Sequence, residues 1–110
     1  METFDKFYAL AAPIRREIIA LLADGDQLTA TAIAEKFQVS APAISQHLKV
    51  LLNSILVDVH KQAQQRIYTL NPTAIRELET WANQITTQLN KVGHMVEQQL
   101  PKTIRPEGNQ

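Results

Sequence analysis

The sequence predicts a small, mainly α-helical domain that carries one β-hairpin, and three features support this. Capping residues and prolines divide the first half of the chain into short segments with helical spacing of apolar residues. The spacing changes to strand-like alternation in LVDVH and RIYTL, and a long helical repeat follows. The chain has 110 residues, 45% of them hydrophobic, and no cysteine. We therefore expect one domain whose stability comes from packing and association.

Four helices are expected before the hairpin, over residues 3–10, 13–24, 29–37 and 40–52. Pro13 suits the first turn of a helix, where its missing N–H is not needed, and Gly25 suits a helix end. Thr29 and Ser40 are predicted N-caps, because their side chains can accept hydrogen bonds from the first free N–H groups of a helix. The short turn QVS joins the third helix to the fourth.

The fourth helix, SAPAISQHLKVLL, is expected to have one core face and one polar face. At about 3.6 residues per turn, four aliphatic side chains share a face and predict contact with a core, namely Ile44, Leu48, Leu51 and Leu52. The other surface carries hydrogen-bonding groups, namely Ser45, Gln46, His47 and Lys49. This surface lacks most of the Glu and Lys pairs that usually cover a helix exposed only to solvent. We therefore expect it to contact a polar ligand.

The hairpin is predicted from residues that favour β-structure on both sides of KQAQQ. Val57 and Val59 alternate with polar neighbours, and RIYTL contains several β-favouring residues. The intervening segment has no glycine, which the tightest two-residue turns usually require. We therefore expect a longer and looser loop at the tip.

A long last helix is predicted from Asn71 and Pro72 onward. Its apolar positions step by threes and fours, as in a helix packed lengthwise against another; they are Ile75, Leu78, Ala82, Ile85, Leu89, Val92 and Val96. One short domain cannot easily cover this stripe, so we expect pairing with a second copy. Residues 101–110 contain two prolines and no periodicity, so they are expected to be a disordered tail that follows a domain of residues 1–100.

Composition narrows the classes of function. No apolar run approaches the ~20 residues that span a bilayer, and the acidic, aromatic N-terminus is unlike a signal segment, so a cytoplasmic protein with no membrane partner is expected. The sequence has no paired carboxylates, glycine-rich loop or nucleophile beside a base, which argues against an enzyme. The formal net charge is zero, but residues 40–70 hold three basic residues and one acidic residue. This is a weak indication of a nucleic-acid partner.

Short helices, a tight turn and a hairpin in this order indicate a winged helix-turn-helix. The chain resembles the ArsR-type bacterial transcriptional repressors over roughly residues 4–100, through AAPIRREIIALLADGD, AIAEKFQVSAPAISQHLKVL, RIYTLNP and RELETWANQ. The resemblance implies a homodimer, paired through its first and last helices, that binds double-stranded DNA. The fourth helices would enter successive major grooves, and the wings would lie along the backbone or minor groove.

The resemblance also implies which residues form the sites. The DNA-facing positions are held by Ser40, Ala41, Ala43, Ser45, Gln46 and His47, and the wing positions by Lys61, Gln64, Gln65 and Arg66. The dimer interface is expected at Phe4, Phe7, Ile75, Leu78, Ala82, Ile85, Leu89 and Val92. Gln46 can bond an adenine edge in two places and Ser45 can bond either purine, whereas Lys49 and Arg66 suit phosphates better.

The chain departs from the family pattern at several positions. The family usually has a glycine where Ser54 and Ile55 stand, and a glycine with basic residues in the wing tip, so moderate affinity for the DNA backbone is expected. Its metal sensors use a cysteine pair, which is absent here, or two carboxylates and two histidines on the last helix. His94 and Glu97 match half of that second site, but Trp81 and Asn83 hold the other half and are not credible zinc ligands. We therefore expect no metal and no other cofactor.

Other interpretations stay open. A metal- or ligand-responsive derepressor of the same family, or a winged helix that binds proteins instead of DNA, fits the same elements. His47 suits either a DNA contact or a structural role. Arg15 and Arg16 could form a basic patch, but pairing with neighbours such as Glu17 or with the acidic last helix is expected instead. Aromatic side chains are expected to lie in the core rather than to line a ligand pocket; they are Phe4, Phe7, Tyr68 and Trp81.

Overall fold

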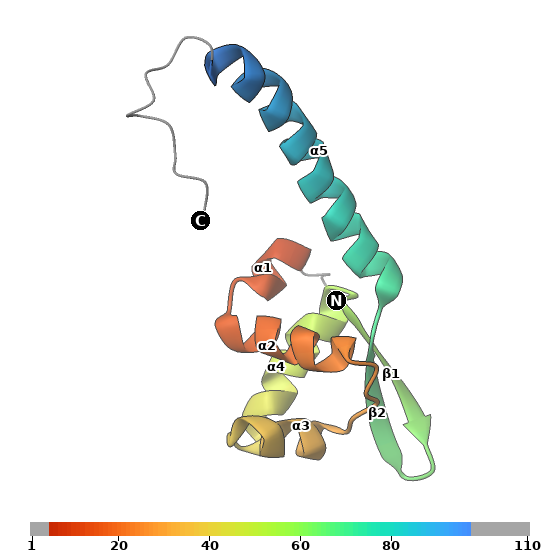
Figure 1. The fold of residues 1–110 in the computed structure, drawn as a ribbon. Helices are drawn as coiled ribbons and strands as arrows, with labels where there is room; N and C mark the ends of the chain where they lie inside the picture. The colour runs from red at the N-terminus through yellow and green to blue at the C-terminus, as the bar shows by residue number, and fades with distance from the viewer. Residues whose placement is uncertain (1–4, 98–110) are drawn as a thin grey trace. The chain divides into compact units, whose positions relative to one another are not determined.

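The computed structural model describes residues 5–97 of the chain and the side chains of residues 5–93. The chain divides into two units, Met1–Arg76 and Glu77–Gln110. The elements follow in the order α1 (Lys6–Leu10), α2 (Pro13–Ala23), α3 (Ala30–Phe37), α4 (Ala41–Asn53), β1 (Val57–Gln62), β2 (Gln65–Leu70) and α5 (Pro72–Glu97) (Figure 1). No helix within residues 5–97 is long and apolar enough to cross a membrane.

The predicted helix starts are confirmed at three N-caps. Thr29 Oγ1 accepts a hydrogen bond from the N–H of Ala32 at 3.1 Å, and Ser40 Oγ accepts one from the N–H of Ala43 at 3.2 Å. The side chain of Asn71 does the same at the start of α5. Each bond satisfies an N–H group that has no partner within its own helix, so α3, α4 and α5 begin where the sequence predicted.

The first helix is shorter than the predicted segment 3–10. Asp5 has extended backbone angles, φ −64° and ψ 140°, and its carboxylate accepts a hydrogen bond from the N–H of Phe7, so α1 begins at Lys6. Within α1 only Ala9 is buried, whereas the side chain of Phe7 is exposed. The expectation of a core position is therefore wrong for Phe7. Phe4 lies outside the described residues.

The core of the first unit lies between α2, α3, α4 and the strands. Its large fully buried aliphatic side chains come from each of these helices, from the residue before β1 and from the first residue of β1; they are Ile18, Leu22, Ile33, Ile44, Leu48, Leu51, Leu56 and Val57. Burial of one such side chain contributes roughly 1.5–3 kcal/mol, so the aliphatic face of α4 fixes which of its side chains point outward. α3 and α4 pack on each other, and Gln38, in left-handed conformation at φ 58°, ends α3 in the turn between them.

The hairpin is tighter than the sequence predicted. β1 and β2 pair antiparallel from Val57 opposite Leu70 to Gln62 opposite Gln65. This register leaves only residues 63 and 64 in the loop, so the expectation of a longer loop is wrong. Ala63 supplies a positive φ of 58° without glycine, at a cost of about 1–2 kcal/mol that the pairing of the two strands offsets.

A short bridge holds the hairpin beside the start of α3. The N–H of Tyr68 donates to the carbonyl of Leu28 at 2.8 Å, and the N–H of Leu28 donates to the carbonyl of Tyr68 at 3.3 Å. Leu28 immediately precedes the N-cap Thr29. The bridge therefore brings the Tyr68 side chain next to the first turn of α3.

The described part of α5 beyond residue 76 belongs to the second unit. Along this helix, Ile85, Leu89 and Val92 are 44%, 62% and 48% exposed. Ala82 and Trp81 are exposed too, so Trp81 is not the core residue that we expected, whereas Ile75 and Leu78 are half-buried. The side chain of Val96 and all of residues 101–110 lie outside the described part of the chain.

Candidate nucleic-acid interface

The side of α4 opposite its buried residues carries the predicted DNA-facing side chains. Most of them are exposed, namely Ser40, Ala43, Ser45, Gln46 and Lys49, while Ala41 and His47 are half-buried. The hydroxyl of Ser40 is engaged as the N-cap of α4. Within residues 5–93, the side chains of Ser45 and Gln46 form no hydrogen bond, so their polar atoms are available to a ligand.

His47 faces a different environment from these neighbours. Its Nδ1 lies 3.2 Å from Nη1 of Arg15, and Nε of Arg15 donates to the carbonyl of Ala9 at 2.6 Å. Because a guanidinium has only donors, Nδ1 must be the acceptor, which leaves the proton of a neutral ring on Nε2. Burial and the positive charge of Arg15 both lower the pKa of His47 from its ordinary 6.5. His47 therefore has a structural contact with the side chain of Arg15 rather than with the backbone. Its contact with DNA stays a prediction, for which Nε2–H is available.

Both arginines of α2 bind backbone carbonyls near α1. Arg16 Nη1 donates to the carbonyl of Leu10 at 2.6 Å, in parallel with the bond from Arg15 to Ala9. Within residues 5–76, both guanidinium groups bond to carbonyls that end a short helix and have no backbone partners, instead of pairing with Glu17. The two side chains join α1 to α2, and Arg15 extends this connection to α4 through His47.

The wing presents positive charge and amide groups near its tip. Lys61 and Arg66 are opposite each other in the hairpin register, and both are exposed. Gln64 and Gln65 are exposed beside them. Like charges directly opposite each other are unfavourable in an isolated sheet, and a polyanion would neutralise them. The wing is therefore suited to contact with phosphates.

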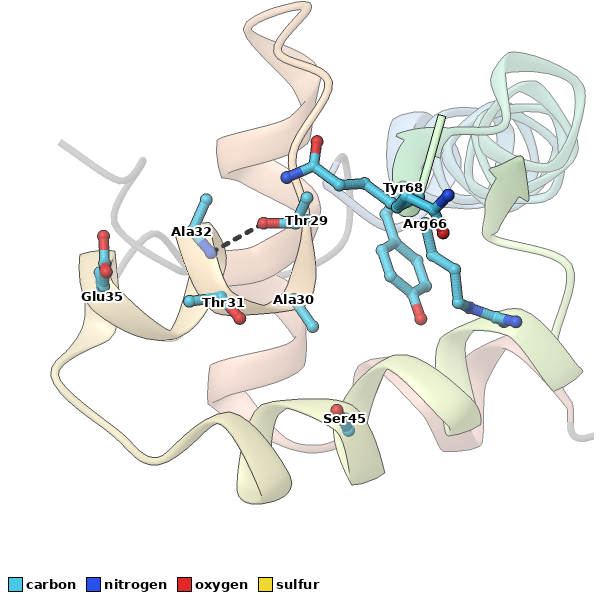
Figure 2. A pocket seen from close by; sticks show the side chains of 10 residues that line it. Thr29, Ala30, Thr31, Ala32, Glu35, Ser45, Arg66 and Tyr68 are labelled. Atoms are coloured by element: carbon cyan, nitrogen blue, oxygen red, sulfur yellow. Dashed lines mark hydrogen bonds between the residues drawn. The ribbon is translucent and has the colours of Figure 1, made fainter. Parts of the chain in front are cut away.

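An open concavity of about 710 Å³ lies between α3, α4 and β2 (Figure 2). It brings Ser45 of α4 together with Gln64, Gln65 and Arg66 of the wing. It is also lined by residues that sequence reasoning missed, namely Thr29, Thr31, Glu35 and Tyr68. Tyr68 could have been identified, because residues two apart in a strand share a face and Tyr68 is two residues from Arg66.

Metal binding finds no support in the described residues. Within them, no group of three or more His, Asp or Glu side chains is placed to hold a metal ion. The side chains of His94 and Glu97 lie outside the described part, so the expectation of no metal site stays a prediction.

Comparison with known proteins identifies relatives across most of the chain. The model of the bacterial regulatory proteins of the arsR family matches residues 12–59. The transcriptional repressor SdpR of Bacillus subtilis is 40% identical over 75 residues, which are 68% of this chain and 82% of SdpR. The transcriptional activator HlyU of Vibrio cholerae is 30% identical over 83 residues, which are 76% of each chain.

A solved structure supports the same relationship. A possible transcriptional regulator for arsenical resistance is 28% identical and superposes with a TM-score of 0.69, over 90% of this chain and 100% of that one. Helix-turn-helix and wing therefore have the arrangement found in solved relatives.

Proposed function

Because the chain belongs to the ArsR family of bacterial regulatory proteins, we propose that it is a homodimeric repressor that reads a specific DNA sequence with α4. The family consists of winged helix-turn-helix transcription regulators, so the chain binds DNA and is not an enzyme. The dimer, the direction of regulation and the roles of individual residues are the parts that we propose.

The observation that carries the reading role is the free polar surface of α4. Ile44 and Leu48 are completely buried, so Gln46 points outward from a helix whose rotation is fixed by packing. A glutamine amide can bond an adenine edge in two places in the major groove. Gln46 is therefore the principal base-reading residue in this proposal, with Ser45 beside it.

The basic residues have a different role. Lys61 and Arg66 are exposed on the hairpin, and Lys49 is exposed on α4. Contacts between such residues and phosphates fix the register of a protein on the duplex without carrying sequence information. We assign backbone contacts to these three side chains and to the amides of Gln64 and Gln65.

Dimerisation is supported by the apolar stripe of α5. Ile85, Leu89 and Val92 are spaced by four and three residues and are largely exposed in the single chain. Stripes of this spacing pack against a second helix in coiled coils and bundles. The second copy of α5 is the partner that we propose, with Phe7 of α1 at the same interface.

Repression is favoured over activation by similarity. The repressor SdpR is 40% identical and the activator HlyU is 30% identical to this chain. A dimer that covers promoter DNA blocks polymerase without a further contact, whereas activation requires one. A reporter whose promoter overlaps the bound site distinguishes the two, since expression of the protein lowers the output of the reporter only for a repressor.

The reading role is tested by two substitutions measured on two DNAs. Fluorescence anisotropy would give the affinity of wild type, Gln46→Ala and Arg66→Ala for a duplex selected by the protein and for a scrambled duplex. Gln46→Ala should cost about 1–3 kcal/mol on the selected duplex and much less on the scrambled one. Arg66→Ala should weaken both by similar factors and reduce the slope of the salt dependence.

Arg66→Ala is thus the matched control for general loss of DNA affinity. If Gln46→Ala leaves the ratio of the two affinities unchanged while its helical circular dichroism is native, Gln46 does not read bases. The assignment of α4 as the reading helix would then fail.

A further inference from the structure

We propose that the concavity between α3, α4 and β2 binds one phosphodiester of the DNA backbone, held by the Tyr68 hydroxyl and the first N–H groups of α3. The proposal rests on the proposed DNA-binding orientation of α4 and the wing. It adds a site that the residues of α4 and the wing tip do not form by themselves.

The start of α3 supplies two backbone donors. The N–H of Ala32 bonds to Thr29 Oγ1 and the N–H of Ile33 bonds to the carbonyl of Thr29. Within residues 5–97, the N–H groups of Ala30 and Thr31 have no acceptor, and both residues line the concavity. Free N–H groups at a helix start, together with the helix dipole, favour an anion.

Tyr68 gives an independent indication of a ligand. Its side chain is only 7% exposed, and its ring projects from β2 into the space between the start of α3 and Ser45 (Figure 2). Its hydroxyl has no hydrogen-bond partner among the described residues. No buried side-chain oxygen of that part of the chain lacks a partner, so the hydroxyl must reach the solvent inside the concavity. A nearly buried hydroxyl normally has a partner, and a phosphate oxygen would supply one.

The path of DNA across the protein leads a phosphate to this place. A major groove and the neighbouring minor groove are separated by one sugar-phosphate backbone. If α4 lies in the first and the wing reaches the second, that backbone must pass between Ser45 and Arg66. Both residues line the concavity, with Tyr68 and the α3 N–H groups at its inner wall.

The charged side chains that line the concavity favour a phosphate on its Arg66 side. Arg66 is its positive group, and Glu35 is its negative group. In Figure 2 Glu35 lies at the end of α3 away from Arg66, while Tyr68 and Thr29 lie between them. A phosphate bound near Arg66 would therefore lie close to the hydrogen-bond donors and farther from the carboxylate of Glu35.

The test compares wild type with Tyr68→Phe, which removes only the hydroxyl. No hydrogen bond within the described residues is lost, so thermal stability should be unchanged. Anisotropy with a selected and a scrambled duplex should show a loss of about fivefold to tenfold on both, because a hydrogen bond to a charged phosphate carries no sequence information. Thr69→Val is the matched control; it removes a hydroxyl from the opposite face of β2 and should bind DNA as wild type does.

A second measurement locates the contact. A single uncharged methylphosphonate replaces one phosphate at a time along the selected duplex. At one position per half-site, this replacement should clearly lower the DNA affinity of wild type but should lower that of Tyr68→Phe much less. The proposed phosphate site is wrong if Tyr68→Phe binds both duplexes as tightly as wild type does. It is also wrong if the loss of DNA affinity caused by Tyr68→Phe is the same with every methylphosphonate duplex. That outcome leaves the proposed function intact, whereas wild type that fails to bind any duplex would overturn the proposed function itself.

Inorganic phosphate separates the DNA backbone from a small anion as the occupant. At constant ionic strength, phosphate should change the amide NMR signals of Ala30 and Thr31 only weakly and without saturation, because one free anion lacks the contacts made by the rest of the duplex. Tight, saturable binding of phosphate that is lost in Tyr68→Phe would instead assign the concavity to a small anionic ligand and overturn the proposal.

Discussion

At the scale of single residues, the conformation of Ile55 is the least expected feature of the fold. It joins α4 to β1 with a φ of 65°, and its side chain is 51% exposed. A β-branched residue rarely adopts this left-handed conformation. The family pattern has a glycine at the position of residue 54 or 55. Residue 55 is the one with the left-handed backbone that favours glycine.

Replacement of Ile55 by glycine should stabilise the protein. Glycine relieves the left-handed strain, but it also has greater conformational freedom in the unfolded chain, which offsets part of this gain. The free energy of unfolding should therefore rise by roughly 0.5–1 kcal/mol. Urea denaturation at fixed protein concentration measures it. Ile55→Val keeps the branched side chain and should show no gain; equal stability of wild type and Ile55→Gly would contradict the strain argument.

His47 makes stability depend on pH. Its pKa is lowered in the folded state by burial and by Arg15, so folding favours the neutral ring. The contribution of the ring to stability is complete above the unfolded-state pKa of about 6.5 and is lost as the pH falls through the lower folded-state pKa. The free energy of unfolding should therefore decrease as the pH falls from about 7 through the lowered folded-state pKa of His47.

The contribution of His47 is isolated by His47→Gln. Glutamine keeps an acceptor for Arg15 but does not titrate, so this variant should lose less stability over the same pH range. His60→Gln changes an exposed histidine of β1 and serves as the control with the wild-type slope. The same pH slope in all three proteins would mean that the contact between Arg15 and His47 does not discriminate between the charge states of the ring.

At the scale of elements, the features predicted correctly are those that depend on near neighbours in the sequence. Thr29, Ser40 and Asn71 cap helices through bonds to N–H groups three residues ahead. The core face of α4 follows from helical spacing alone. The hairpin turn was missed because its length is set by the pairing of two strands, which forces Ala63 into a conformation that its own preference disfavours.

The site was predicted in part for the same reason. Exposure of Gln46 and Arg66 follows from the pattern of each element. The position of Tyr68 beside the start of α3 depends on a bridge to Leu28, forty residues earlier in the chain. The bond between Arg15 and His47 likewise joins two helices that are distant in sequence, so no local pattern indicates it.

The apolar stripe of α5 predicts the effect of charge on assembly. Ile85 and Leu89 are exposed in the single chain, so Ile85→Asp with Leu89→Asp buries no charge within one chain but would bury unpaired charges between two, at a cost of several kcal/mol. Sedimentation should show a monomer, and the first unit of the double variant should keep its native helicity. Thr87→Asp, on the opposite face of α5, should remain dimeric; a dimer in the double variant would place the interface elsewhere.

At the scale of the whole molecule, a formal net charge of zero makes general attraction to DNA small. In the proposed function, specificity then depends on geometry, because α4 would read bases while the wing and the concavity would hold phosphates. The proposed dimer would double these contacts and set the distance between the two copies of α4. The proposed arrangement therefore predicts the form of the DNA site as well as the roles of the protein residues.

Selection of duplexes from a random pool by the wild-type protein, followed by footprinting of the enriched sequence, tests this claim most directly. A two-fold symmetric dimer with one α4 in each of two successive major grooves predicts an inverted repeat whose half-sites lie about 10–10.5 base pairs apart, centre to centre. The footprint should protect both half-sites together. Enrichment of a single asymmetric half-site, or no enrichment over the starting pool, would contradict the account.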